Sequence, residues 1–218
     1  MLERASVTLH VGGQGVGKTT AMCELARAHM QKKWRVLVVV NRRDDLERFS
    51  LLARPALVSS SGEADAAELA GERLLIWTHP RDESIALPDA DAAVLWASTH
   101  GPLLVCVTEA HLYWRPWPAQ LRPTTLRFFT NTRHSSSVVL LDTQALGQLN
   151  AVVRDAATQL RVFSQGGKAL ADLRAAAKPE LAAAAEECGR LIATRDQVGW
   201  FVEVDPRAPF PPYRLRRF

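Results

Sequence analysis

A glycine-rich run that ends in a lysine and a threonine is the part of the sequence best suited to chemistry. The run Gly12-Gly13-Gln14-Gly15-Val16-Gly17-Lys18-Thr19 matches the pattern GxxxxGK[ST]. Successive glycines allow backbone N–H groups to curl around phosphate oxygens, and a following helix adds the positive end of its dipole. Lys18 would bring its charge to the β- and γ-phosphates, and the Thr19 hydroxyl would coordinate Mg²⁺. We therefore predict that Gly12 to Thr20 bind the phosphates of ATP together with Mg²⁺.

Such a site also needs a carboxylate, and the apolar run Leu103–Val107 leads directly to one. Thr108 stands where an aspartate is usual, and Glu109 follows it. Glu109 could orient or deprotonate the attacking water. The Thr108 hydroxyl could hold a magnesium-bound water, although without charge, so the missing aspartate puts the rate of hydrolysis in question. The alternative is that Glu109 only begins a loop.

Another apolar run, Ser137–Asp142, is preceded by an arginine and followed by a glutamine. The amide of Gln144 can both donate and accept hydrogen bonds, so beside a γ-phosphate it could sense whether that group is present. Arg133 could stabilise the charge of the transferred phosphoryl group if it reaches the nucleotide of a neighbouring subunit. Gln144 could instead be a turn residue and Arg133 a surface or nucleic-acid contact, and Arg127 and Arg122 are alternative arginine fingers.

The apolar pattern predicts the elements that would position these residues. A strand at Ser6–Val11, a helix at Lys18–Lys32 and a strand at Arg35–Val40 form a βαβ unit around the phosphate loop. The same patterns predict strands at Leu74–Thr78, Leu103–Val107, Ser137–Asp142, Gln159–Phe163 and Val198–Val204, and helices at Ala92–Ser98, Thr124–Asn131 and, broken at Pro179, Lys168–Thr194. This alternation predicts an α/β fold. We expect residues 1–205 to form one ATPase domain and the Pro/Arg-rich residues 206–218 an arm.

Composition narrows the class of protein further. Of the 218 residues, 47% are hydrophobic and 23% charged, which is typical of a globular domain and excludes a disordered chain. No apolar run approaches the roughly 20 residues of a membrane-spanning helix, and residues 3–13 lack the apolar core of a secretory signal, so we expect a cytoplasmic protein. Cys23, Cys106 and Cys188 are far apart and odd in number, which predicts buried free thiols rather than a disulfide framework or a zinc site.

Charge is unevenly distributed along the chain. Between Asp44 and Asp91, 11 carboxylates and four arginines give a local charge of −7, so the rest of a chain with a total of +4 carries +11. Residues 110–141 contain no carboxylate but four arginines: Arg115, Arg122, Arg127 and Arg133. This asymmetry is expected if one face meets phosphates and another faces solvent or a partner protein, although chance clustering on a solvated face is the alternative.

An aromatic cluster, Tyr113-Trp114-Arg115-Pro116-Trp117-Pro118, lies in the same carboxylate-free segment. Arginine and aromatic rings suit both a loop that faces a pore and a loop that contacts a neighbouring subunit. The other interpretation, a loop fixed to the core by two tryptophans, has equal weight.

Taken in order, these features resemble the FtsK-HerA superfamily of P-loop ATPases, which pump DNA. The resemblance spans roughly residues 5–165 and depends on the phosphate loop, a strand ending in Glu109, and Arg133 before a strand ending in Gln144. The segments TEAH, NTRHSSSVVLLDTQ and VVRDAATQLRVF look most like the compact viral members. Those members are genome-packaging ATPases and the zonular occludens toxin-like assembly proteins of filamentous phages.

The resemblance implies a P-loop NTPase fold with a central, mainly parallel RecA-like sheet flanked by helices, in which the Gln144 strand lies between the phosphate-loop strand and the Glu109 strand. It also implies hydrolysis of ATP to ADP and phosphate by a homo-oligomeric ring, usually of six subunits, with the arginine acting in trans on the neighbouring site and double-stranded DNA in the pore. A capsid or portal-like docking protein and association with virions would go with packaging. Filamentous-phage members typically carry a membrane span, and large translocases carry extra domains, so packaging is the preferred interpretation.

Other functions share parts of the pattern. A small-molecule kinase has the same phosphate loop but also needs an acceptor pocket and a lid. A GTPase is disfavoured because Asn41-Arg42-Arg43-Asp44 comes too early for guanine recognition, and a DEAH-type helicase because TEAH has no second motor domain beside it. A different class stays open, namely a module that binds ATP and assembles but hydrolyses it poorly because of Thr108.

Overall fold

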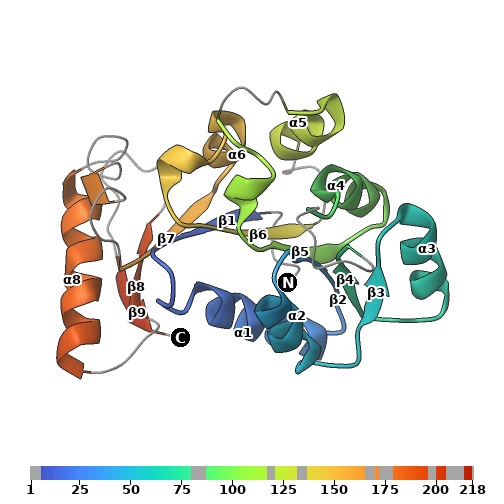
Figure 1. The fold of residues 1–218 in the computed structure, drawn as a ribbon, viewed down its shortest axis with the longest axis horizontal. Coiled ribbons are helices and arrows are strands. Elements are labelled where there is room, and N and C mark those ends of the chain that lie inside the picture. Colours follow the sequence, from blue (N-terminus) through green and yellow to red (C-terminus); the bar gives the residue numbers. More distant parts are fainter. Residues whose placement is uncertain are drawn as a thin grey trace.

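The computed structural model describes residues 6–79, 87–116, 121–131, 137–164, 170–171, 179–195, 200–204 and 214–217. Within these ranges the chain forms a sheet with helices on both faces (Figure 1). Its elements are, in chain order, β1 (Ser6–Val11), α1 (Lys18–Gln31), β2 (Arg35–Val39), α2 (Arg43–Ser50), β3 (Ala56–Val58), α3 (Ser61–Leu69), β4 (Leu74–Trp77), α4 (Ala90–Thr99), β5 (Leu103–Val107), η1 (Ala110–Leu112), α5 (Pro123–Thr130), β6 (Val138–Thr143), η3 (Leu146–Gln148), α6 (Ala151–Asp155), β7 (Gln159–Phe163), α8 (Pro179–Arg195), β8 (Trp200–Val204) and β9 (Arg214–Arg217).

The described strands form one sheet in the order β3-β4-β2-β5-β6-β1-β7-β8-β9. Pairing is parallel from β3 to β7, and β8 and β9 extend the β7 edge in antiparallel pairs. Strand β6, which leads to Gln144, lies between β1 and β5, so the predicted strand arrangement is confirmed. Because parallel strands share their direction, β1, β5 and β6 all end at one edge of the sheet, and ligands of such sheets bind there.

Alternating side chains divide the core between the two faces of the sheet. On one face, Leu9 and Leu141 belong to a buried cluster that also contains residues of α4, α5 and α6. On the opposite face, Leu104 and Leu140 pack with residues of α1 and α2. Figure 1 shows the two layers above and below the strands, with α8 beside β7 and β8. The predicted α/β class with a mainly parallel, helix-flanked sheet is therefore confirmed.

The apolar strands and the helices with clear start signals lie where the sequence predicts them. Asp89 caps α4 by accepting from the Ala92 N–H at 2.9 Å, and Pro123 begins α5. The polar stretch after β2 was not resolved into elements by the sequence, yet it forms α2, β3 and α3. A signal for α3 was present, because the Ser60 hydroxyl accepts from the Glu63 N–H at 3.3 Å while the Glu63 carboxylate accepts from the Ser59 N–H.

The segment expected to be an arm contributes a strand to the sheet. Arg214–Arg217 form β9, which pairs with β8 through Trp200↔Arg217 and the three pairs that follow. Residues 206–213 and 218 lie outside the described residues, so the domain boundary at residue 205 stays a prediction.

The predictions for the cysteines and for membrane spans can also be compared with the structure. Cys23, Cys106 and Cys188 are free and buried, as predicted. Among the described helices, none combines the length and the apolar character needed to cross a bilayer.

His10, the penultimate residue of β1, gives a prediction on stability. Burial, with the charges of Arg161 and Lys18, lowers the pKa of His10 from 6.5 to about 3. The unfolded chain therefore takes up a proton below pH 6.5 that the folded protein does not. From pH 7 to pH 5 this one group should reduce the free energy of unfolding by about 2 kcal/mol.

The His10→Leu variant should lack this contribution, so its loss of stability between pH 7 and pH 5 should be smaller by that amount. Urea unfolding of both proteins at the two pH values measures the difference. An equal loss in both proteins would contradict the proposed neutral state of His10.

Candidate nucleotide site

A cavity of about 370 Å³ opens at the edge where β1, β5 and β6 end. The structure brings together in its lining most of the residues predicted for ATP binding and hydrolysis, along with several that were not predicted. The lining residues are Gln14, Gly15, Gly17, Lys18, Thr19, Thr20, Arg42, Asp44, Asp45, Arg48, Glu109, Asp142 and Gln144. The other predicted loop residues, Gly12, Gly13 and Val16, support the loop without lining the cavity.

Glycine conformation shapes the loop between β1 and α1. Gly15 and Gly17 have φ values of 76° and 96°, in the left-handed region that favours glycine. Gly17 is also the N-cap of α1, and no side chain caps the helix there or adds an acidic group to its first turn. The N–H groups at this end are therefore available to an anionic ligand.

Lys18 turns back over the loop from the first turn of α1. Its ammonium group donates to the carbonyl oxygens of Gly12 and Gly13 at 2.8 and 2.7 Å. Burial lowers the pKa of Lys18, and the nearby negative charges of Asp142 and Glu109 oppose that effect. A positive charge is thus held at the cavity wall, at the end of the loop predicted to bind phosphates.

Glu109, the residue directly after Thr108, lines the same cavity. Its φ of 51° is left-handed, which turns the chain sharply at the end of β5. The carboxylate forms an ion pair with Arg42 at 2.9 Å and accepts from the amides of Gln144 at 3.3 Å and Asn41 at 3.4 Å. Glu109 and Gln144, predicted from separate strands, are therefore direct neighbours.

Three cavity carboxylates, those of Asp44, Asp45 and Asp142, were not assigned a role from the sequence. Asp142 is 2% exposed, and burial raises its pKa to about 6 although the charge of Lys18 lowers it. Burial also raises the pKa of Asp45, which a hydrogen bond with the Thr19 hydroxyl opposes. Asp142 ends an apolar run, so the sequence could have indicated it as a site residue. Nothing in the linear sequence connects Asp45 with Thr19.

Two cationic side chains near α2 were also missed. Arg42 is the N-cap of α2 and pairs with Glu109, and the Arg48 guanidinium donates to the Thr20 hydroxyl at 3.3 Å. Both line the cavity. The only signal was the run of charged residues directly after an apolar strand, a position where ligand-binding residues are common.

Thr108 lies directly after β5 in a buried position. Its side chain is fully buried, and its hydroxyl and backbone N–H both donate to the Val39 carbonyl, at 3.4 and 3.1 Å. It is not among the residues that line the cavity, so the predicted handling of a metal-bound water by Thr108 gains no support. Arg133 lies outside the described residues.

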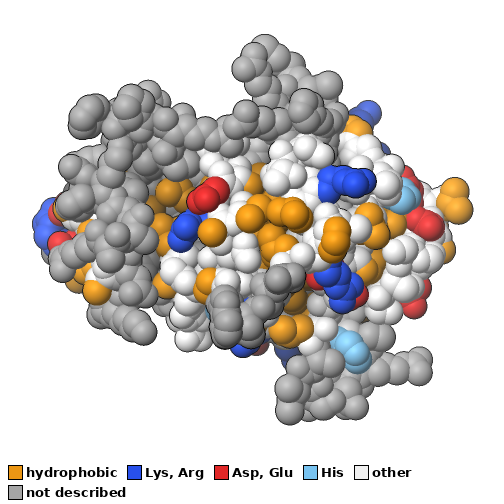
Figure 2. Space-filling view, turned by 90° about the horizontal axis from the view of Figure 1, so that it is seen from above, with side chains coloured by type: hydrophobic (Ala, Val, Ile, Leu, Met, Phe, Trp, Pro, Cys, Tyr) orange, Lys and Arg blue, Asp and Glu red, His pale blue; other side chains and the backbone are white. Residues whose placement is uncertain are grey.

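The carboxylate-free segment proves to be partly neutralised by residues from outside it. Arg122 pairs with Asp89 and Asp91 at 3.2 Å each. Arg127 is exposed beside a groove of about 450 Å³ between α4 and α5. Figure 2 looks onto this side of the molecule, where hydrophobic side chains lie in the middle and acidic ones gather toward the right-hand edge.

The aromatic cluster of the same segment is described in part. Trp114 is buried, packs edge-on against Phe129 and donates to Asp91, which fits the interpretation of a loop fixed to the core by this ring. Trp117 lies outside the described residues.

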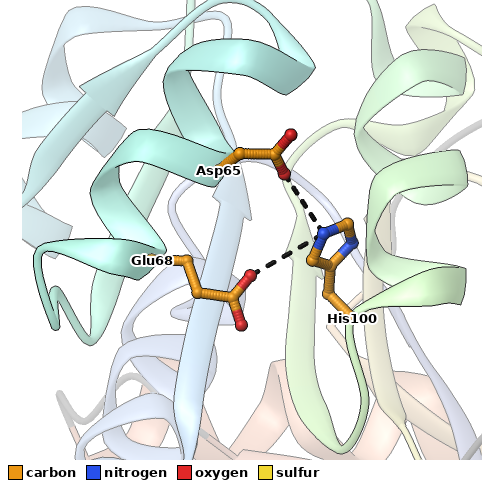
Figure 3. Close-up of side chains that lie close together, drawn as sticks. All are labelled: Asp65, Glu68 and His100. Atoms are coloured by element: carbon orange, nitrogen blue, oxygen red, sulfur yellow. Dashed lines mark ion pairs between the residues drawn. The ribbon is translucent and has the colours of Figure 1, made fainter.

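Asp65, Glu68 and His100 form a second polar cluster, between α3 and the end of α4 (Figure 3). Their spacing would allow a metal ion, but the cluster already has its own partners. His100 Nε2 lies 3.1 Å from Asp65 and 3.7 Å from Glu68, Trp96 donates to Asp65 at 2.7 Å, and the Arg35 guanidinium pairs with Glu68. Because the Arg35 guanidinium already pairs with Glu68, the cluster is a network of side-chain contacts that links α3 to the end of α4.

Comparison with known proteins supports the fold. No family model matches the chain, and no curated protein does. Among solved structures, B204, the DNA-packaging ATPase from Sulfolobus turreted icosahedral virus, is similar at a TM-score of 0.72 and 15% identity, over 100% of this chain and 98% of that one. The genome packaging NTPase B204 from Sulfolobus turreted icosahedral virus 2, in complex with ATP-gammaS, is similar at a TM-score of 0.68 and 15% identity, over 97% of this chain and 96% of that one. The N-terminal domain of zonular occludens toxin from Neisseria meningitidis has a TM-score of 0.50 and 14% identity, over 99% of this chain and 95% of that one. The chain therefore shares the fold of these proteins.

Gly12 allows a test of how closely the loop is packed. A Cβ at Gly12 would lie 2.6 Å from the Phe163 Cβ, whereas one at Gly13 would meet nothing closer than 3.6 Å. Gly12→Ala should therefore lower the free energy of unfolding by about 1–3 kcal/mol through overpacking. Gly13→Ala is the matched control, with a change within about 0.5 kcal/mol. Urea unfolding without nucleotide measures both, and equal effects would contradict this packing argument.

Proposed function

We propose that this chain is an ATPase that moves double-stranded DNA, most closely comparable to viral genome-packaging ATPases, and that it works as a ring of identical subunits. One observation carries the proposal. The ammonium group of Lys18 and the Glu109–Gln144 pair face a single cavity from three different parts of the chain. The likeness to DNA-packaging B204 over almost the whole length of both chains supports the same function.

In this proposal the phosphate loop and the start of α1 bind the phosphates of ATP. Lys18 places its charge against the β- and γ-phosphates, and Glu109 accepts the proton of the attacking water. Gln144, hydrogen-bonded to Glu109, lies where it can respond to loss of the γ-phosphate. Mg²⁺ would neutralise charge on the phosphate oxygens, and the Thr19 hydroxyl is an oxygen ligand of the kind it prefers.

The assembly around this site is part of the same proposal. Arg133 would act on the nucleotide of the next subunit, DNA would pass through the ring, which we propose to be hexameric, and a capsid or portal-like protein would dock it. This would place the protein in the host cytoplasm or with virions. The likeness to the zonular occludens toxin domain keeps a filamentous-phage-type assembly ATPase as an alternative.

A second candidate, an ATP-binding switch that hydrolyses slowly, is favoured by the surroundings of Glu109. Its carboxylate is paired with Arg42 at 2.9 Å, and Thr108 supplies no charge beside it. While this ion pair is closed, the Arg42 guanidinium occupies the carboxylate that would act on the attacking water. Turnover would then require the Arg42–Glu109 pair to open.

ATPase assays with and without double-stranded DNA separate the two candidates. The motor should show turnover stimulated by DNA, and Lys18→Ala and Glu109→Gln should each reduce it by at least about 100-fold, since both groups act on the transferred phosphoryl group or its water. Glu47→Gln is the matched control, because Glu47 is exposed on α2 and pairs only with Arg43 among the described residues. Tight ATP binding without turnover would reject the motor and favour the switch.

The DNA role predicts different effects for Arg122, the N-cap of α5, and for Arg127 within α5. Arg127 has no carboxylate partner among the described residues, whereas Arg122 is paired with Asp89 and Asp91. Arg127→Glu should therefore weaken DNA binding more than Arg122→Glu, and it should reduce the slope of log K against log salt by about 1. The exposed Arg54, in the turn before β3, gives the control variant Arg54→Glu. Binding that is unchanged by Arg127→Glu at every salt concentration would remove this segment from the DNA interface.

A further inference from the structure

Three neighbouring strands place a threonine, an aspartate and a histidine side by side beneath α1. The β1–β6 register pairs His10 with Asp142, and the β5–β6 register pairs Val107 with Leu141, so Thr108 follows next to Asp142. Cys106 and Leu140, two residues earlier on each strand, pack on the α1 face. Side chains repeat with a period of two, so Thr108 and Asp142 belong to that same face.

These two neighbours differ in what they offer the cavity. The Thr108 hydroxyl is committed to the Val39 carbonyl and carries no charge. Asp142 lines the cavity together with Lys18. A cavity carboxylate is therefore on β6, one strand away from the position after β5 where an aspartate is usual.

Asp142 also fixes the position of Glu109. Its Oδ1 accepts a hydrogen bond from the Glu109 backbone N–H, at the residue whose left-handed φ turns the chain into the cavity. One oxygen of Asp142 thus holds the turn, while the side chain lines the cavity together with Lys18. An asparagine at this position would keep an oxygen acceptor for the turn and lose only the charge.

We propose that Asp142 takes the place of the carboxylate that Thr108 lacks and, together with Thr19, holds the hydrated Mg²⁺ of a bound nucleotide. This inference rests on the proposed nucleotide site. Mg²⁺ in nucleotide sites is typically held through one or two carboxylates, several waters and the phosphates, and a buried carboxylate beside a hydroxyl fits that set. Asp142 is a positioning residue, because it acts through the metal and its waters and not on the reacting atoms.

Asp45 is the competing candidate, because it lines the cavity and hydrogen-bonds Thr19. It differs in its place in the fold. Asp45 lies in the first turn of α2, whereas Asp142 lies on β6, between the phosphate-loop strand and the strand that leads to Glu109, and accepts from the Glu109 N–H. Asp142 is therefore fixed at the centre of the site, beside the position where an aspartate is usual.

The test is the affinity for a non-hydrolysable ATP analogue, measured by fluorescence titration in millimolar Mg²⁺ and in EDTA. The wild-type protein should bind more tightly in Mg²⁺. Asp142→Asn should reduce this Mg²⁺-dependent gain by about tenfold while the affinity in EDTA stays the same or rises, because a negative charge beside the phosphates is removed. Asparagine keeps an oxygen acceptor for the Glu109 N–H, so the variant should fold, and its thermal unfolding without nucleotide checks this.

Two further variants make the result specific. Thr108→Val, which removes the hydroxyl and keeps the shape, should leave the Mg²⁺-dependent gain within about twofold of wild type. The inference is overturned if Asp142→Asn retains the gain, or if Thr108→Val or Asp45→Asn removes it instead. Failure of the wild-type protein to bind the analogue in either condition would contradict the proposed function itself, which is a different result from binding that ignores Asp142.

Discussion

The parallel pairing of β1, β6 and β5 is the constraint on which the rest of the site depends. It makes three strands end at one edge, so the loop after β1, Glu109 after β5 and Gln144 after β6 meet although they lie up to 130 residues apart. Apolar residues on both faces of these strands hold that register, because a shift of one residue would turn buried side chains toward the wrong layer. The chemistry of the site is thus set by core packing.

Opposite charges meet at this edge of the sheet. Lys18, Arg42 and Arg48 line one cavity with four carboxylates, those of Asp44, Asp45, Glu109 and Asp142. Charges that are buried without partners are costly. Lys18 donates to two loop carbonyls, Arg42 pairs with Glu109, and Asp142 accepts from a backbone N–H. Phosphates entering the cavity would compete with these partners. The same contacts that make the nucleotide-free site stable therefore also determine which groups a nucleotide must displace.

The sequence predicted what depends on local pattern and missed what depends on contacts in space. Apolar runs identify β5 and β6 because strands buried on both faces are continuously hydrophobic, and the phosphate loop has a fixed spacing. The sequence did not predict helices α2 and α3 because each buries few apolar side chains, such as Phe49 and Ala64, within a polar segment. Arg42 and Asp45 became site residues only through neighbours on other elements. Asp142 ends an apolar run that the sequence shows, but only the strand register shows that it lies beside Thr108.

The acidic block between Asp44 and Asp91 illustrates the same limit for charge. Counted along the chain it suggests one acidic face, but the structure places six of its eleven carboxylates in three separate surroundings. Asp44 and Asp45 line the cavity, Asp65 and Glu68 join His100 and Arg35 beside α3, and Asp89 and Asp91 neutralise Arg122. Part of the positive charge expected to attract DNA is therefore already paired. A phosphate backbone would meet its strongest attraction at arginines that the fold leaves exposed and unpaired, so local pairing, and not the net charge of a segment, decides where nucleic acid can bind.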